Sequence, residues 1–316
     1  MTLALKKIWP LLLLTLVLVA VFLLLDLPSN YAYALERRST KIIAIIIVSC
    51  AVSFSSVVFQ TLTDNRILTP SIMGFEAVYF LFQTLIVFMY GDKTFTVINQ
   101  KGNFFLSIIF MLGFAFILFQ FLFKKEKNNL YLLLLIGLVL GTLFQTVSSF
   151  LQLIIDPNEF LMLQGTLYAS FNNINYELLW YALGTIIVCF VVGSRQLKHL
   201  DVMVLGRDNA INLGVDYFKK SRFFLFIIAV LVAVSTALVG PITFLGILVT
   251  NLTYELFKTY KHHILIPACC LISTVSILVA QYIVEHIFHF NSTISIIINF
   301  VGGLYFMYLL FKVKRI

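Results

Sequence analysis

Apolar residues run along this chain in long blocks, and short polar segments separate the blocks. A helix that crosses a bilayer needs about 20 mostly apolar residues, and about ten blocks approach that length. We therefore predict about ten transmembrane helices in one all-α integral membrane domain covering residues 1–316. The predicted spans are 8–25, 42–60, 72–89, 104–123, 130–155, 176–193, 223–239, 242–257, 264–286 and 294–311.

Composition supports this interpretation. Hydrophobic residues make up 61% of the 316 residues, charged residues make up 11%, and the mean hydropathy is +1.01. A soluble domain carries about 25% charged residues and about 45–50% apolar ones. These values exclude soluble, disordered and disulfide-rich classes. The four cysteines lie inside apolar blocks without metal-ligand spacing, so we expect them to pack as small buried side chains.

The distribution of positive charge predicts the orientation. With the N-terminus in the cytoplasm, 17 of the 22 Lys and Arg residues fall in cytoplasmic segments, as positively charged loops usually do. Both termini are then cytoplasmic. The net charge of +8 marks topology and gives no reason to expect nucleic acid as a partner. Arg37, Arg38 and Lys41 cluster on the opposite side, where they either contact lipid phosphates or meet a partner.

The sequence shows no motif for catalysis or nucleotide binding. It contains no GxxxxGK[ST] loop, no HExxH and no His/Cys cluster at metal-ligand spacing. We therefore expect no cofactor, no metal site and no catalytic residue, which leaves a transporter or a channel. Glu76 is the most interior of the acidic residues near the spans. Such a group is a candidate for function, and it could line a pathway or pair with a neighbouring helix.

Residues 198–220 lie in the longest cytoplasmic connection. Asp201 is predicted to cap a short helix that stops at Gly206, and Asp208 to cap a second that stops at Gly214. Helices of one or two turns are unstable alone in water. The segment is therefore either docked on a partner protein or a plain surface loop.

Two further patterns concern packing. The apolar block at 242–257 is short for a span, so we expect that helix to be tilted, broken or buried within the bundle. Gly137 and Gly141 form a small-xxx-small pair in the fifth span. That spacing is typical of closely packed membrane helices.

Five motifs occur in order along the chain. They are RSTK at 38–41, Gln60 with NRILTPSIMG at 65–74, LGRDNAINLGV at 205–215, GPITFLG at 240–246 and HILIP at 263–267. In this order they resemble the RxxR, Q…NPLAxPxxLG, LGxxxAxxLGV, GxIxFxG and HxxLLP motifs of the FecCD-type permeases. These are the permease subunits of ABC importers for iron-siderophores and cobalamin. The resemblance runs from about residue 38 to the C-terminus.

The chain departs from that family at several positions. Thr250 and Asn251 replace a Pro-His pair, and Gln281 replaces an Asp in the ninth span. These departures resemble a siderophore branch whose members work beside a second, different permease chain. The resemblance therefore implies a heterodimer rather than a homodimer.

The resemblance implies the type II ABC importer permease architecture and a place in the bacterial cytoplasmic (inner) membrane. The expected function is import of an iron-siderophore complex, with lipid around the chain. Expected partners are a second permease, cytoplasmic ATP-binding subunits and an extracytoplasmic siderophore-binding protein that meets Arg38 and Lys41. The residues expected to contact the ATPase are Asp201, Val202, Leu205, Gly206, Arg207, Asp208, Ala210, Leu213, Gly214 and Val215.

Two alternatives remain open at this point. The same architecture could import cobalamin, haem or a free metal ion. A stand-alone secondary transporter or channel is the alternative from another class. It would depend on an ion gradient rather than on ATP, and the sequence shows no developed relay of buried charges.

Overall fold

A computed structural model describes residues 3–25, 30–123, 130–172 and 174–313, which fold into helices without strands. The α-helices are α1 (Leu3–Leu24), α2 (Tyr31–Thr63), α3 (Phe75–Tyr90), α4 (Thr94–Val97), α5 (Gln100–Phe123), α6 (Leu130–Ile154), α7 (Pro157–Leu167), α8 (Tyr176–Ser194), α9 (Leu197–Met203), α10 (Arg207–Asn212), α11 (Tyr217–Val239), α12 (Leu245–Leu256), α13 (His262–His286) and α14 (Ile294–Val313). Two 3₁₀ helices, η1 (Pro70–Met73) and η2 (Gly91–Lys93), precede and follow α3.

A helix lies at each predicted span. Within the described residues, seven helices are long and apolar enough to cross a membrane, namely α1, α2, α5, α6, α8, α11 and α13. The shorter apolar helices are α3 and the Ile294–Tyr308 part of α14. Helix α12 has 12 residues, or about 18 Å at 1.5 Å per residue, and most of its side chains are buried. The all-α multi-pass fold is therefore confirmed, and the eighth span is short and buried as the pattern predicts.

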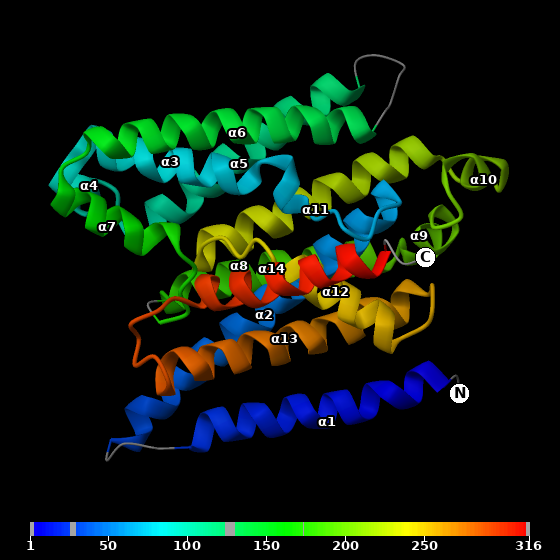
Figure 1. Cartoon of the computed structure of the whole chain (residues 1–316), viewed down its shortest axis with the longest axis horizontal. Helices are drawn as coiled ribbons and strands as arrows, with labels where there is room; N and C mark the ends of the chain where they lie inside the picture. Colours follow the sequence, from blue (N-terminus) through cyan, green and yellow to red (C-terminus); the bar gives the residue numbers. More distant parts are fainter. Residues whose placement is uncertain (1–2, 26–29, 124–129, 173, 314–316) are drawn as a thin grey trace.

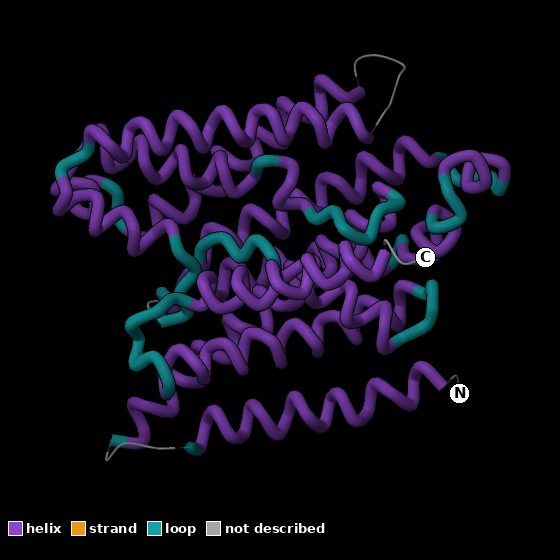
Figure 2. Tube along the Cα trace, viewed as in Figure 1, coloured by secondary structure: helices purple, strands orange, loops and turns teal. Residues whose placement is uncertain are grey.

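The long helices lie side by side with their axes roughly parallel or antiparallel (Figure 1). Helix α1 forms one edge of the bundle, and α3, α5 and α6 form the opposite edge. Helices α9 and α10 lie at the same end as the start of α1 and the end of α14; we call this the α9 end. Helices α4 and α7 lie at the other end, which we call the α7 end. Loops join the helices mainly at these two ends (Figure 2).

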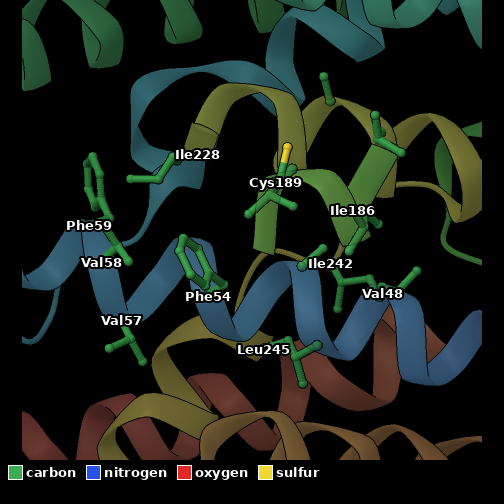
Figure 3. Close-up of a cluster of buried hydrophobic side chains, with 14 of the residues drawn as sticks. Val48, Phe54, Val57, Val58, Phe59, Ile186, Cys189, Ile228, Ile242 and Leu245 are labelled. Carbon is green, nitrogen blue, oxygen red and sulfur yellow. The ribbon is translucent and has the colours of Figure 1, made fainter. Parts of the chain in front are cut away.

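Helix α2 is the centre of the bundle. It packs against α1, α8, α11, α12 and α13, and 78% of its most apolar window is buried, against 11% for α1. Figure 3 shows Phe54 and Val57 of α2 among side chains such as Ile186, Ile228 and Leu245 from neighbouring segments. The helix is longer than the predicted span, because it begins at Tyr31. Arg37, Arg38 and Lys41 therefore lie on a helix and not in a loop.

Close backbone approaches fix the position of α6. A Cβ added to Gly137 would lie 2.9 Å from the Cα and the carbonyl oxygen of Met73, and one added to Gly141 would lie 3.1 Å from Gly74 Cα. Helix α6 thus packs with its glycine face on the corner between η1 and α3. The glycine pair is a packing surface, as predicted.

Candidate functional site

Glu76 lies in the first turn of α3, where two non-helical stretches of backbone meet within the bundle. Its Oε1 accepts a hydrogen bond from Ser71 Oγ at 2.7 Å, and its Oε2 accepts one from Thr243 Oγ1 at 2.6 Å. Ser71 belongs to η1, and Thr243 belongs to the segment that joins α11 to α12. The carboxylate therefore ties α3 to both interrupted regions.

A small cavity of about 30 Å³ lies beside this carboxylate. Hydroxyl groups from α2 and α11 line it, among them Ser55, Ser56, Ser235 and Thr236. A space of this size holds about one or two water molecules. Of the two roles that the sequence left open for Glu76, the structure shows the pairing with neighbouring segments. A role on the transport pathway stays a prediction.

Side chains of α2 and α12 hold the loop between α2 and η1. Gln60 Nε2 donates to the carbonyl of Arg66 at 2.8 Å and to Thr250 Oγ1 at 2.9 Å. Asn251 Nδ2 donates to the same Arg66 carbonyl at 3.1 Å. Irregular backbone inside a membrane protein needs such internal partners. Thr250 and Asn251, which depart from the family motif, thus have a structural role here.

An open cleft of about 500 Å³ lies at the α9 end of the bundle. Gln60, Thr61, Arg66, Val204, Lys258 and His262 are among the residues that line it. The guanidinium of Arg66 lies 4.9 Å from the centre of the Tyr254 ring. The cleft therefore borders both α9 and the loop that Gln60 holds.

The expected caps of the short helices are wrong. Gln196 and Gly206 stand at the N-caps of α9 and α10, because α9 starts almost directly after α8. Asp208 is the second residue of α10, where a carboxylate near a helix N-terminus is favourable. Asp201 lies inside α9 and caps another helix, since its Oδ1 accepts the backbone N–H of His262 at 2.8 Å. It also contacts His262 Nδ1 at 2.7 Å.

These contacts affect the acidity of Asp201. Partial burial raises the pKa of its carboxyl group, and the ring and backbone hydrogen bonds from His262, together with electrostatic attraction to His262 and His263, lower it by more. The pKa therefore lies below its ordinary value. At neutral pH Asp201 is an anion that holds α9 against the start of α13.

The glycine positions of this segment agree with expectation. Gly206 has φ +89° and Gly214 has φ +84°, a region that favours glycine. Val215 N–H donates to the Ala210 carbonyl at 3.0 Å and Gly214 N–H to the Ile211 carbonyl at 2.9 Å. This is the Schellman arrangement that ends α10.

The surface of the α9–α10 segment is partly apolar. Ala210 is fully buried, and Val202 and Val215 are half-buried. Leu205 is 55% exposed and Leu213 is 62% exposed, beside the exposed polar residues Arg207 and Asp208. Exposed apolar side chains with a polar rim are typical of a protein-binding surface. This surface lies beyond the spans, at the end of the bundle (Figure 1).

The two predicted docking cations at the α7 end bind within the chain. Arg38 Nη1 donates to the carbonyls of Phe22 and Leu23 at 3.1 and 3.2 Å, so it satisfies the last turn of α1. Lys41 Nζ lies 2.7 Å from Glu285 Oε1, and the two side chains are 15% and 11% exposed. The positive charge of Lys41 is therefore largely balanced inside the protein.

A neighbouring cation is exposed instead. Arg37 lies on the surface with its guanidinium 5.6 Å from the centre of the Tyr33 ring. Both residues line an open pocket of about 440 Å³, together with Glu36, Asn172 and Tyr176. This pocket is a polar concavity at the α7 end.

Neither a metal cluster nor a disulfide occurs in the part of the chain that the structure describes. No three His, Cys, Asp or Glu side chains come together there, and the four cysteines are free. No sequence pattern predicts the Asp201–His262 and Lys41–Glu285 contacts, which join residues 61 and 244 positions apart. Contacts over such separations arise from the packing of the helices.

Comparisons with known proteins add a family. A sequence model of a protein family, described as the FecCD transport family, matches residues 6–312. The chain is 48% identical over 302 residues to YclO, a petrobactin import system permease protein of Bacillus subtilis, with 96% of each chain covered. It is 34% identical over 292 residues to FatC, a petrobactin import system permease protein of Bacillus anthracis, with 92% of this chain and 82% of FatC covered.

A solved structure has the same fold. It shows a metal-chelate type ABC transporter in an inward-facing conformation, and it matches with a TM-score of 0.85. The match covers 98% of this chain and 99% of that chain, at 24% sequence identity. The predicted type II ABC importer permease architecture is confirmed.

Proposed function

This chain belongs to the FecCD transport family, and we propose that it is the permease subunit of an ABC importer that carries an iron-siderophore complex into the cytoplasm. The observation that carries the proposal is its 48% identity, over nearly the full length of both chains, to a petrobactin import permease. A second petrobactin permease is 34% identical. Ferric petrobactin or a similar chelate is therefore the cargo that we propose.

The chain would act beside a second, different permease. Bacillus subtilis and Bacillus anthracis each have a further petrobactin permease, YclN and FatD, and these are only 22% and 27% identical to this chain. The chain thus resembles one member of each pair more closely than the other. We propose one copy of each permease per complex, in the bacterial cytoplasmic membrane.

The chain itself would be a non-catalytic subunit. ATP would be hydrolysed by cytoplasmic subunits that dock on the exposed apolar surface of the α9–α10 segment, which includes Leu205 and Leu213. This role would place the α9 end, and with it both termini, in the cytoplasm. The charge distribution that favours cytoplasmic termini supports the same orientation.

The siderophore-binding protein would dock at the α7 end. Arg37 is an exposed cation there. Arg38 and Lys41 belong to the same surface, but their bonds to α1 and to Glu285 make them supports of its shape. Acidic residues of the binding protein would then meet Arg37 at the rim of the 440 Å³ pocket.

Reconstitution tests the function. The two permeases and the ATPase are placed in liposomes, with ATP inside and ⁵⁵Fe-petrobactin on its binding protein outside. We expect accumulation that requires both ATP and the binding protein. Parallel arms offer cobalamin or haem with their own binding proteins. Native mass spectrometry of the complex should show one copy of this chain.

Three results would contradict the proposal. Uptake driven by a proton or sodium gradient without ATP would indicate a secondary transporter. Uptake of cobalamin or haem in place of the iron chelate would assign another cargo. Reporter fusions at Arg207 and Asn158 test the orientation, and a cytoplasmic signal at Asn158 would refute it.

A further inference from the structure

Three helices converge on the side chain of His262, the first residue of α13. The residue is 1% exposed. Its Nδ1 lies 2.7 Å from Asp201 Oδ1 in α9, and its Nε2 lies 2.8 Å from Thr61 Oγ1 near the end of α2. The backbone N–H of His262 binds the same Asp201 oxygen. One buried ring thus connects the short surface helix to two long helices of the bundle.

The chemistry of the partners keeps both ring bonds in place. An ionised carboxylate only accepts hydrogen bonds, so Nδ1 carries the hydrogen that faces Asp201. The hydroxyl of Thr61 both donates and accepts, and the Val57 carbonyl lies 3.0 Å from it as an alternative acceptor. Nε2 can therefore accept from Thr61 or donate to it. The connection persists with a neutral or a charged ring.

Other contacts of α9 are apolar or bind the start of the helix. Leu200 and Met203 are buried against the bundle, and Lys220 Nζ donates to Gln196 Oε1 at the start of the helix. Apolar packing is not directional, so it lets a short helix slide or rotate. The Lys220 bond holds only the N-cap, whereas the hydrogen bonds of His262 hold Asp201 in the middle of α9 and so restrict the rotation of the helix.

The connection also borders the cleft at the α9 end. Thr61, His262 and Val204, the C-cap of α9, all line the 500 Å³ space. Any displacement of α9 that His262 transmits to α2 would therefore change the wall of this cleft. The loop held by Gln60 is next to it on the same wall.

We propose that His262 is the positioning residue that makes α9 move as one body with α2 and α13, so that motion of the ATPase reaches the wall of the cleft. The inference rests on the proposed function, because it assumes that an ATPase docks on the α9–α10 segment. The exposed residues of the segment would dock the ATPase, and His262 would transmit its motion to the bundle.

Two amide substitutions separate the two bonds. In His262→Asn the side-chain nitrogen can occupy roughly the place of Nδ1. This variant keeps the hydrogen bond to Asp201 and loses the one to Thr61. In His262→Gln the side-chain nitrogen can reach roughly the place of Nε2. This variant keeps the hydrogen bond to Thr61 and loses the side-chain bond to Asp201. His263→Gln is the matched control, because His263 is the exposed next residue.

The first readout is ATP turnover of the assembled complex with and without the loaded binding protein. We expect the His262→Gln complex to assemble. Its stimulation of ATP turnover by the loaded binding protein should fall at least about five-fold, which is the lower end of a typical coupling between sites. Transport per ATP should fall with it, and His262→Asn should lie between Gln and wild type. His263→Gln should keep full stimulation.

The second readout needs no transport. Spin labels at Lys198 of α9 and Asp64 after α2, in a chain whose four native cysteines are alanine, report the distance between these elements. Both positions are exposed. We expect His262→Gln to broaden the distance distribution in the isolated chain. This result stands even if the wild-type complex fails to import iron chelates, so the two proposals can fail separately.

Three outcomes would overturn the inference. Full stimulation in His262→Gln would show that the bond to Asp201 transmits nothing. An unchanged distance distribution would show that apolar packing alone holds α9. Failure of both amide variants to assemble would show that His262 serves the fold rather than the coupling.

Discussion

Gly137→Ala should loosen the contact of α6 with the corner between η1 and α3. The added Cβ would lie 2.9 Å from two backbone atoms of Met73 and 3.1 Å from a third, where ordinary contacts begin at 3.4 Å. Backbone atoms cannot rotate away from the new methyl group. Helix α6 and η1 must therefore separate by roughly half an ångström to relieve the overlap.

The expected magnitude follows from two opposing effects. Overpacking costs about 1–3 kcal/mol, and the better helix propensity of Ala offsets about 1 kcal/mol. We therefore expect a net loss of up to about 2 kcal/mol in the free energy of unfolding relative to wild type, and about 1–3 kcal/mol relative to a glycine-to-alanine change that causes no overlap. For a chain of this length the thermal midpoint should fall by up to about 3 °C relative to wild type. Because η1 carries Ser71, the shift also disturbs the hydrogen bond to Glu76, and iron uptake should fall.

The assay is thermal unfolding of the purified chain in detergent. Unfolding is monitored as the loss of the fraction that stays monodisperse on size-exclusion chromatography after heating. Gly113→Ala in α5 and Gly184→Ala in α8 are matched controls, because no heavy atom beyond the adjoining helix backbone lies within 4 Å of a Cβ at either position. Both should unfold at or above the wild-type midpoint. A Gly137→Ala protein that unfolds with the controls would refute the reasoning.

Three further predictions concern the ends of the bundle. Lys41→Met should lower the thermal midpoint, because Glu285, 11% exposed, loses its ion-pair partner; adding Glu285→Leu should restore most of the loss. Gly206→Ala should speed proteolytic cleavage of the α9–α10 segment, since φ +89° with ψ 165° is essentially a glycine conformation and costs another residue about 1–3 kcal/mol. Asp201→Asn should lower the midpoint above pH 5 and cease to matter in strong acid. The pKa of Asp201 is lowered from 3.8, so the ionised carboxylate stabilises the fold above that value, and this stabilisation is lost as the pH falls through the folded-state pKa.

Much of the fold could be predicted because the bilayer constrains it strongly. A span needs a minimum length of apolar residues, and each predicted span corresponds to a helix. The same reasoning missed α7, an 11-residue helix with Asn158, Glu159 and Gln164 among its residues. It also missed the first residues of α2, where charged side chains occupy a continuous helix. Hydropathy identifies helices in lipid and says little about helices that extend beyond it.

In the candidate site, too, features with a local cause could be predicted and features that depend on packing could not. Gly206 and Gly214 could be predicted because glycine at a helix end reflects a local backbone requirement. The caps could not, because Asp201 has several possible partners in sequence and the packed bundle selects His262. The docking role expected of Lys41 depends on its charge and on the resemblance of RSTK at 38–41 to the RxxR motif. The structure adds Glu285, and a paired charge has a different use from a free one.

The last turn of α2 binds both the loop before η1 and, through His262, helix α9. Gln60 and Thr61 are consecutive residues, so their side chains point in different directions from one turn of the helix. Gln60 holds the loop before η1 and Thr250 of α12, and Thr61 holds His262 and through it α9. If His262 positions α9 as we propose, motion that arrives at Thr61 acts on the same turn that holds the loop through Gln60. The central, most buried helix would then serve as the rigid element between the ATPase surface and the interrupted backbone around Glu76.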